Sequence, residues 1–256
     1  MFSSAFYIYL YVMIGVAIIV FIALNFVDAG YGINFSHKWG KAINNKLAWF
    51  LMEFPIFISM LIIYLCSDRR TELVPIIILI FFEIHYFQRA FIFPFIIKGK
   101  SKMPLGIMFM GIAFNILNSV MQGYWIFFES PDGYYSIEWL YTPQFIIGTI
   151  LFFVGMIINL HSDYIIRHLR KSDTDTRHYL PQGGLFKYVT SANYFGELIE
   201  WLGFAILTWS LSGFVFFLWT FANLVPRARS THEKYKIKFP EEMANKNLKR
   251  IFPFIY

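Results

Sequence analysis

Residues 6–27 read FYIYLYVMIGVAIIVFIALNFV, a run without a single charged side chain. An apolar run of about 20 residues is long enough to cross the hydrocarbon core of a bilayer as an α-helix. This run is too long for the apolar core of a secretory signal peptide. It also lacks a basic segment before it and a convincing small-residue cleavage site after it. The sequence therefore predicts a retained transmembrane helix here.

Further apolar runs of similar length follow along the chain, separated by short polar segments. They predict helices at residues 46–66, 74–97, 105–128, 143–167, 194–209 and 213–225. The last two form one apolar block, in which Ser210, Ser212 and Gly213 suit a tight hairpin turn. One long tilted helix is the alternative. We expect an all-α fold, a seven-transmembrane-helix bundle that forms a single membrane-embedded domain over residues 1–256.

The composition agrees with a membrane protein, since 57% of the residues are hydrophobic and only 15% are charged. Soluble domains are nearer about 45–50% apolar and about 25% charged. The single cysteine, Cys66, excludes an intramolecular disulfide framework and a cysteine-based metal cage. The six histidines show no HExxH or comparable spacing, so no metal site is predicted.

Positive charge predicts the orientation, because cytoplasmic loops of membrane proteins are enriched in Lys and Arg. With seven helices and the N-terminus outside, nearly every cation lies on the cytoplasmic side, including those of the C-terminal segment. The outer loops then hold only two cations, Arg69 and Arg70. Six helices would instead place the basic C-terminal segment outside. We therefore expect the N-terminus out and the C-terminus in the cytoplasm, and the net charge of +6 needs no nucleic-acid partner.

Ionisable and amide side chains inside the predicted helices are candidates for function, since an unpaired charge is costly in a bilayer. Glu53 stands two positions before a proline, and the next helix carries Glu83, His85, Tyr86 and Arg89. Two polar stripes recur every three or four residues and so follow one helix face each. They comprise Asn159, Asp163, Arg167 and Arg170, and Asn193, Glu197 and Glu200. Internal salt bridges are the structural alternative, and we interpret Glu200 as structural.

The segment between the two stripes contains Pro181-Gln-Gly183-Gly184, and paired glycines let a backbone approach a ligand closely. The C-terminal segment adds Arg227, Arg229, His232 and Tyr235. Cations, glycines and aromatic rings at the cytoplasmic end would suit a phosphorylated ligand that contains rings. No GxGxxG fingerprint of a soluble dinucleotide fold is present. Contact with anionic lipid is the alternative for the basic segment.

Three stretches of the C-terminal half closely resemble the steroid 5-alpha-reductase family. They are NLHSDYIIRHLRK at 159–171, PQGGLFKYVTSANYFGELIEW at 181–201 and RARSTHEKY at 227–235. The ending IFPFIY at 251–256 fits the same pattern, as do GYG at 30–32, AWFLMEFP at 48–55 and HYFQR at 85–89. The resemblance extends over nearly the whole chain, and its N-terminal motifs favour the steroid branch of the superfamily.

The resemblance implies a seven-helix membrane reductase that uses NADPH on a 3-oxo-Δ4 steroid. Residues 1–128 would mainly serve the substrate, which would enter laterally from lipid, and residues 143–256 mainly the cofactor. By analogy the cofactor contacts would be Asn159, Asp163, Arg170, Asn193, Glu197, Arg227, His232 and Tyr235, with Tyr31 and Trp49 nearby. Tyr179 is a looser transfer, because the family often has Tyr-Arg where this chain has Arg177-His178-Tyr179. Met52 stands where the steroid enzymes commonly place Gln.

The chemistry of such a reduction points to Glu53 and Tyr86 as the catalytic pair. Hydride delivery to the β-carbon of a conjugated enone builds negative charge on the carbonyl oxygen, which hydrogen-bond donors stabilise. Both residues lie on adjacent helices in the apolar region, where burial favours a neutral carboxylic acid. A neutral Glu53 would donate to the 3-oxo oxygen beside the Tyr86 phenol, as a protonated carboxyl does in ketosteroid isomerase. The structural alternative is a Glu53–Arg89 ion pair.

Two other functions remain open from the sequence. A related membrane reductase would act on polyprenal or trans-2-enoyl thioesters, and a seven-helix transporter or receptor would bind no NADPH. The expected partners are a lipophilic steroid and membrane lipids, with no nucleic acid and no obligate protein partner. The membrane would be the bacterial inner membrane or the endoplasmic reticulum. The abundance of Phe, Ile, Lys and Asn is typical of an AT-rich genome and favours a bacterium.

Overall fold

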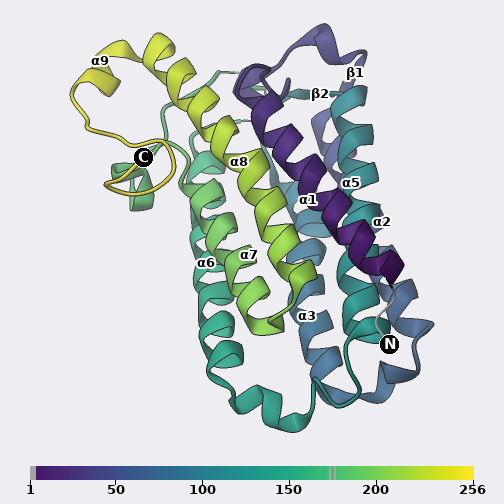
Figure 1. The fold of residues 1–256 in the computed structure, drawn as a ribbon. Helices are drawn as coiled ribbons and strands as arrows, with labels where there is room; N and C mark the ends of the chain where they lie inside the picture. The colour runs from purple at the N-terminus through teal and green to yellow at the C-terminus, as the bar shows by residue number, and fades with distance from the viewer. Residues whose placement is uncertain (1–3, 173, 176) are drawn as a thin grey trace.

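The computed structural model describes residues 4–172, 174–175 and 177–256 as a bundle of long helices (Figure 1). Each of the seven predicted apolar segments overlaps one or more of its helices. The long helices are α1 (Ser4–Leu24), α2 (Asn45–Leu65), α3 (Leu73–Phe87), α5 (Leu105–Tyr124), α6 (Pro143–His168), α7 (Ala192–Thr208) and α8 (Leu211–Lys238). The short helices α4 (Phe93–Ile96) and α9 (Pro240–Ala244) complete the set of α-helices in the described part of the chain.

Six helical segments of the described chain are long and apolar enough to cross a membrane. They are α1, α2, the continuous stretch Leu73–Ile96, the stretch Leu105–Glu129, α6 and α8. The prediction of a mostly helical membrane protein is thereby confirmed. The remaining long helix, α7, has 17 residues and packs between α6 and α8.

The hairpin between α7 and α8 lies where the sequence predicted it. Trp209 adopts a left-handed conformation with φ of 45° and ends α7. The Ser210 hydroxyl then accepts a hydrogen bond from the Gly213 amide at 3.0 Å and caps α8. Because a serine hydroxyl satisfies an otherwise unpaired amide at a helix start, it favours a new helix over a continuous one.

The predicted end of the last helix, at residue 225, was wrong, because α8 continues to Lys238. The apolar character ends near Val225, but the following residues include Arg, Ala, Glu and Lys, which are good helix formers. Hydropathy predicts the residue at which a helix leaves the apolar region, but the helix itself can continue beyond that residue. Arg227, His232 and Tyr235 therefore lie on one continuous helix.

Three local features were not predicted. Residues Gln88–Ile92 and Trp125–Glu129 form π-helical turns, which in other proteins occur often at functional sites. A short antiparallel ribbon pairs β1 (Ala42–Asn44) with β2 (Lys102–Pro104). The ribbon joins the segment before α2 to the segment before α5 at one end of the bundle (Figure 1).

We call that end the basic end and define it by residues 25–44, 97–104, 169–172, 174–175, 177–191 and 239–256. Its parts contact one another and α8. The Arg170 guanidinium donates to the Lys98 carbonyl, and the Thr190 amide donates to the Lys249 carbonyl. Arg229, on α8, donates to Asn25. At the opposite end Arg69 binds Asp132, and the Tyr134 hydroxyl donates to the Trp209 carbonyl. The two sets of loops therefore lie at opposite ends of the bundle.

Helices α6 and α7 approach each other through glycines. A Cβ added at Gly155 would lie 2.2 Å from the Glu200 amide nitrogen, and one at Gly196 would lie 2.5 Å from that of Asn159. Gly148 and Gly203 make equally close approaches one heptad away along the same pair. Small residues allow such backbone contact between membrane helices. The contact brings the two predicted polar stripes together.

Candidate active site

Glu53 is buried on α2 and faces α5. The Asn115 side-chain amide donates one hydrogen bond to Glu53 Oε2 at 3.1 Å and another to the Met52 carbonyl at 2.8 Å. Pro55 lies inside the same helix and removes one of its backbone hydrogen bonds. The Glu53 carboxyl is hydrogen-bonded through Oε2, and its Oε1 has no hydrogen-bond partner among the described residues.

Tyr86 is buried on α3, and its hydroxyl also faces an amide of α5. Asn118 Nδ2 donates to this hydroxyl at 3.4 Å. Gln122 Nε2 in turn donates to Asn118 Oδ1 at 3.2 Å and to the Ser212 carbonyl at 2.9 Å. Asn115, Asn118 and Gln122 were not predicted as site residues. The available signal was their spacing of three and four residues within an apolar helix.

Arg89 lies in the π-helical turn beside this pair and is buried. It forms an ion pair with Asp163 at 3.4 Å, and its guanidinium lies 4.6 Å from the centre of the Trp49 ring. The expected alternative, a direct Glu53–Arg89 ion pair, is not among the contacts of the described residues. Glu53 does interact with the charge of Arg89 over a longer distance. The Glu53 carboxyl therefore has Asn115 as its hydrogen-bond partner.

The two polar stripes meet across the α6–α7 contact. Asn159 donates to the Asn193 carbonyl at 3.0 Å, and Asn193 Nδ2 donates to Asp163 Oδ1 at 3.4 Å. Glu197, one turn further along α7, interacts electrostatically with both Arg89 and Arg227. The structure therefore brings these stripe residues together with Arg89 of the π-helical turn and Arg227 of α8.

Arg227 of α8 contacts aromatic residues of α7 and of the segment after α1. It donates to the Tyr194 hydroxyl at 2.9 Å, and its guanidinium lies 4.1 Å from the centre of the Tyr31 ring. Tyr31 in turn contacts Trp49 edge-on, with ring centres 6.2 Å apart. Burial raises the pKa of Tyr31 to about 12, against the opposing effect of the Arg227 charge, so its phenol is neutral at physiological pH.

These contacts form a closed chain that we call the polar ring. It consists of Arg89, Asp163, Asn193, Tyr194, Arg227, Tyr31 and Trp49. Its members come from α2, the π-helical turn after α3, α6, α7, α8 and the segment after α1. The catalytic candidate Glu53 lies near the ring, since it interacts electrostatically with Arg89, and Tyr86 in turn interacts with Glu53.

Four predicted cofactor residues lie closer to the basic end. Arg170 donates to the Lys98 carbonyl at 2.6 Å, and the Tyr179 hydroxyl donates to Asp175 at 2.7 Å. His232 contacts the Thr190 hydroxyl at 3.2 Å, and Tyr235 packs against Phe239. Among the described residues, no hydrogen bond or ion pair joins these four to the polar ring.

The segment Arg177-His178-Tyr179 divides into two environments. Hydrogen bonds from Arg177 and Tyr179 hold the pKa of Asp175 well below its usual range. Partial burial and the nearby charges of Lys238 and Arg170 lower the pKa of His178, which favours its neutral form. Arg177 and Tyr179 thus both bind the Asp175 carboxylate, whereas His178 makes no hydrogen bond to it in the described structure.

Glu200, interpreted as structural, is fully buried and lies 2.7 Å from His85 Nδ1. The contact joins α3 to α7, and the centre of the His85 ring also lies 4.6 Å from the centre of the Trp201 ring. His85 and Glu200 were predicted in separate polar groups, because they are 115 residues apart in the chain.

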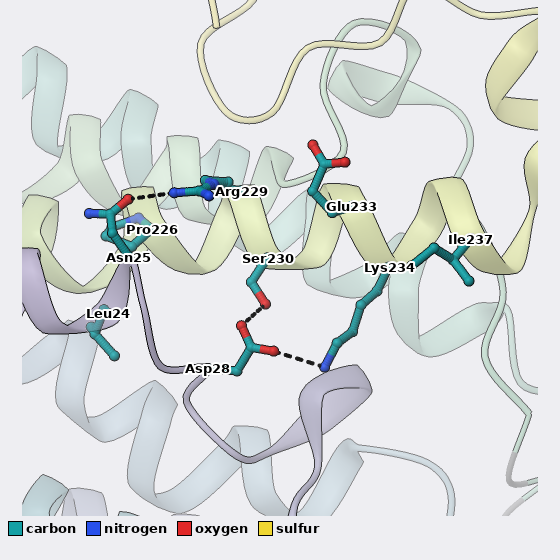
Figure 2. Close-up of a pocket in the computed structure, with 9 residues that line it drawn as sticks. All are labelled: Leu24, Asn25, Asp28, Pro226, Arg229, Ser230, Glu233, Lys234 and Ile237. Atoms are coloured by element: carbon teal, nitrogen blue, oxygen red, sulfur yellow. Dashed lines mark hydrogen bonds and ion pairs between the residues drawn. The ribbon is translucent and has the colours of Figure 1, made fainter.

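The segment after α1 is attached to α8 by a second set of polar contacts (Figure 2). Asp28 accepts a hydrogen bond from Ser230 and forms an ion pair with Lys234 at 3.2 Å, and Arg229 donates to Asn25 at 3.1 Å. Partial burial raises the pKa of Asp28, but the hydrogen bonds from Ser230 and Lys234 outweigh it and lower the pKa overall. This attachment is therefore complete at neutral pH and weakens as the pH falls through that lowered pKa.

Comparison with known proteins identifies the family. Residues 101–256 match the family model described as 3-oxo-5-alpha-steroid 4-dehydrogenase. The chain is 40% identical over 244 residues to 3-oxo-5-alpha-steroid 4-dehydrogenase 1 of Mus musculus, covering 93% of this chain and 92% of that protein. It is 38% identical over 243 residues to steroid 5-alpha-reductase DET2 of Arabidopsis thaliana, covering 92% and 90%.

The Homo sapiens 3-oxo-5-alpha-steroid 4-dehydrogenase 1 is 41% identical over 213 residues, which cover 82% of this chain and 80% of that protein. The family model matches more than half of the chain, and the relatives match nearly end to end. These matches confirm the family expected from the motifs. The chain belongs to the steroid 5-alpha-reductase (3-oxo-5-alpha-steroid 4-dehydrogenase) family and is an oxidoreductase.

Proposed function

We propose that this protein reduces the Δ4 double bond of 3-oxo-Δ4 steroids to give 5α-dihydro steroids, with NADPH as the reductant. The observation that carries the proposal is the pair Glu53 and Tyr86, two buried acidic groups on neighbouring helices that each accept a hydrogen bond from α5. The printed names of the relatives support the substrate class.

The role of the pair follows from where charge develops. As the double bond is reduced, negative charge builds on the 3-oxo oxygen of the steroid. Two O–H donors aimed at that oxygen stabilise the enolate-like state, and each donor contributes on the order of 3–4 kcal/mol in comparable oxyanion sites. A carboxylate at Glu53 would repel the developing charge, so the proposal requires the neutral acid. The apolar surroundings of α2, α3 and α5 favour that form.

The residues around the polar ring fit a nicotinamide dinucleotide. Arg227 Nε and Ser191 Oγ are buried and have no hydrogen-bond partner among the described residues. Leaving such groups unsatisfied costs about 1–3 kcal/mol each, so they suit a polar ligand. Gly183 has a positive φ of 92°, and a Cβ added there would meet nothing within 4 Å, so its backbone is open to close approach. When bound, NADPH would supply the hydride.

The residues that would hold NADPH include the ring and stripe residues Tyr31, Trp49, Asn159, Asp163, Asn193, Glu197 and Arg227. Arg170, Tyr179, His232 and Tyr235 would act nearer the basic end. Arg170 suits phosphate, because guanidinium groups bind phosphate through paired hydrogen bonds.

We further propose that α7 also crosses the bilayer, which makes seven spans with the N-terminus outside and the basic end in the cytoplasm. At 17 residues, α7 is about 25 Å long, slightly less than the hydrocarbon core. The distribution of cations supports the orientation, since the opposite end carries only Arg69 and Arg70 among the described loop residues. A cofactor from the cytoplasm would then reach the basic end directly.

The proposal is tested by NADPH oxidation with the detergent-purified protein and testosterone or progesterone. We expect a product two hydrogens heavier than the substrate, with the retention time of the 5α standard. NADPH binding without steroid turnover would instead favour polyprenal or a trans-2-enoyl thioester as substrate. Folded protein that binds no NADPH would contradict the cofactor assignment and favour a transporter or receptor.

The cofactor residues give a separate prediction. Asn193→Ala and Arg170→Ala should each raise the Kd for NADPH by about tenfold, because each removes hydrogen bonds to a charged or polar ligand. Fluorescence titration of NADPH without steroid measures this directly. Lys171→Ala is the matched control, since it removes an exposed cation next to Arg170. Unchanged affinity in both test variants would count against the assignment of the stripes.

A further inference from the structure

The polar side chains of α5 form a row that no catalytic step uses directly. Asn115, Asn118 and Gln122 are all buried, and their spacing places them on one face of the helix. Amide groups are costly in an apolar helix unless they are hydrogen-bonded. Their hydrogen bonds determine the orientation of each amide group. This orientation decides whether an amide oxygen or an amide nitrogen faces Glu53 and Tyr86.

The direction of the Gln122 amide is set by a backbone carbonyl. Ser212 O can only accept a hydrogen bond, so the Gln122 atom 2.9 Å away must be the nitrogen. The second hydrogen of that nitrogen goes to Asn118 Oδ1 at 3.2 Å. Gln122 Oε1 has no partner among the described residues, so no contact favours the opposite orientation.

This arrangement in turn determines the orientation of Asn118. With its oxygen occupied by Gln122, Asn118 presents its NH₂ group to the Tyr86 hydroxyl at 3.4 Å. The phenol oxygen therefore accepts from Asn118, and the phenol proton is not used in that contact. A flipped Asn118 would present its oxygen instead and would take the phenol proton itself.

The same reasoning applies to Asn115 and Glu53. The Met52 carbonyl lies 2.8 Å from Asn115 Nδ2, so this atom is again the nitrogen. Its other hydrogen goes to Glu53 Oε2 at 3.1 Å. Oε2 is thereby an acceptor, and the acid proton of a neutral Glu53 belongs on Oε1.

We propose that Asn115, Asn118 and Gln122 are positioning residues that keep the O–H protons of Glu53 and Tyr86 free for the substrate carbonyl. This inference rests on the proposed function of Glu53 and Tyr86 as donors. The α5 amides donate to both catalytic oxygens and accept from neither. The backbone carbonyls of Met52 and Ser212 determine this polarity, and Gln122 acts on Tyr86 only through Asn118.

The test is a mutant cycle in the full-length enzyme, with kcat for the steroid and Kd for NADPH measured for each variant. Gln122→Leu frees Asn118 to turn its oxygen toward Tyr86, and we expect kcat to fall about 5- to 10-fold while Kd changes less than about twofold. Adding Asn118→Leu removes the competing acceptor. The double variant should therefore be at least about threefold faster than Gln122→Leu alone.

A packing role predicts the opposite order, because removing a second buried amide would not restore the packing lost with the first. Ser119→Ala is the control, since Ser119 is buried on the same helix and, among the described residues, its hydroxyl bonds only to Ser59 and the Ile116 carbonyl. If Gln122→Leu is not recovered in folded form, Gln122→Met replaces it in the same cycle.

The outcomes separate this inference from the proposed function. Tyr86→Phe is measured alongside. If Tyr86→Phe is slow but Gln122→Leu matches Ser119→Ala, or the double variant is slower than Gln122→Leu, the positioning role is overturned and the catalytic pair stands. If Tyr86→Phe keeps the wild-type kcat, Tyr86 is not a donor to the substrate, and the positioning role of Asn118 and Gln122 falls with it. A slow Gln122→Leu that is partly rescued by Asn118→Leu supports both.

Discussion

Tyr86→Phe and Glu53→Gln should each lower kcat by about 10²-fold or more, while the Kd for NADPH stays within about twofold of the wild-type value. Each substitution removes one strong O–H donor aimed at the 3-oxo oxygen and keeps the shape of the side chain. Neither residue makes a hydrogen bond to the polar ring in the described structure, so cofactor binding should persist. Single-turnover reduction with saturating NADPH measures the chemical step directly.

Matched controls are available on neighbouring helices. Glu83→Gln changes another carboxyl group on α3 whose two oxygens have no hydrogen-bond partner among the described residues. Tyr9→Phe removes a phenol that donates to the Leu117 carbonyl, on the same helix as the positioning amides. Both controls should retain nearly wild-type kcat. Wild-type rates in Tyr86→Phe and Glu53→Gln together would show that the donors to the carbonyl lie elsewhere.

Gly155→Val should destabilise the fold more than any substitution at the surface. Its Cβ would lie 2.2 Å from the Glu200 amide nitrogen and 2.6 Å from the Gly196 carbonyl oxygen. Because both neighbours are backbone atoms, the helices must separate. The expected cost is at least about 3 kcal/mol, the upper range for overpacking. This cost corresponds to a fall of about 6–12 °C in the apparent Tm of a chain of this size.

The measurement is thermal unfolding in detergent. The fraction of protein that stays monodisperse after heating to each temperature gives the apparent Tm. Gly15→Val is the matched control, since Gly15 is also helical and an added Cβ there meets nothing within 4 Å. Gly155→Val should also weaken NADPH binding, because the same helix contact aligns Asn159 with Asn193. An equal Tm for the two variants would show that α6 and α7 can separate at little cost.

The positions of the apolar helices could be predicted from the sequence because hydropathy and length are local properties. The same holds for the hairpin at Ser210, where a capping hydroxyl and a glycine stand together. The two polar stripes were also visible, since their helical spacing places their members on one face. Family membership followed from contiguous motifs, which need no knowledge of the fold.

The choice of partner for each buried polar group was not visible in the sequence. Arg89 was equally suited to Glu53 and to a more distant carboxylate, and only the packed bundle shows that it binds Asp163, 74 residues away in sequence. The amides of α5 were overlooked for a related reason: each looks like an isolated polar residue until α2, α3 and α8 surround it.

The sequence by itself therefore determined the membrane character, the approximate position of each helix and the family. The tertiary structure decided the polar ring, the α6–α7 glycine contact, the length of α8 and the direction of the hydrogen bonds to Glu53 and Tyr86. The reason is physical: burial and periodicity act on each segment separately, whereas a buried hydrogen bond depends on which helices pack together and how closely their backbones approach.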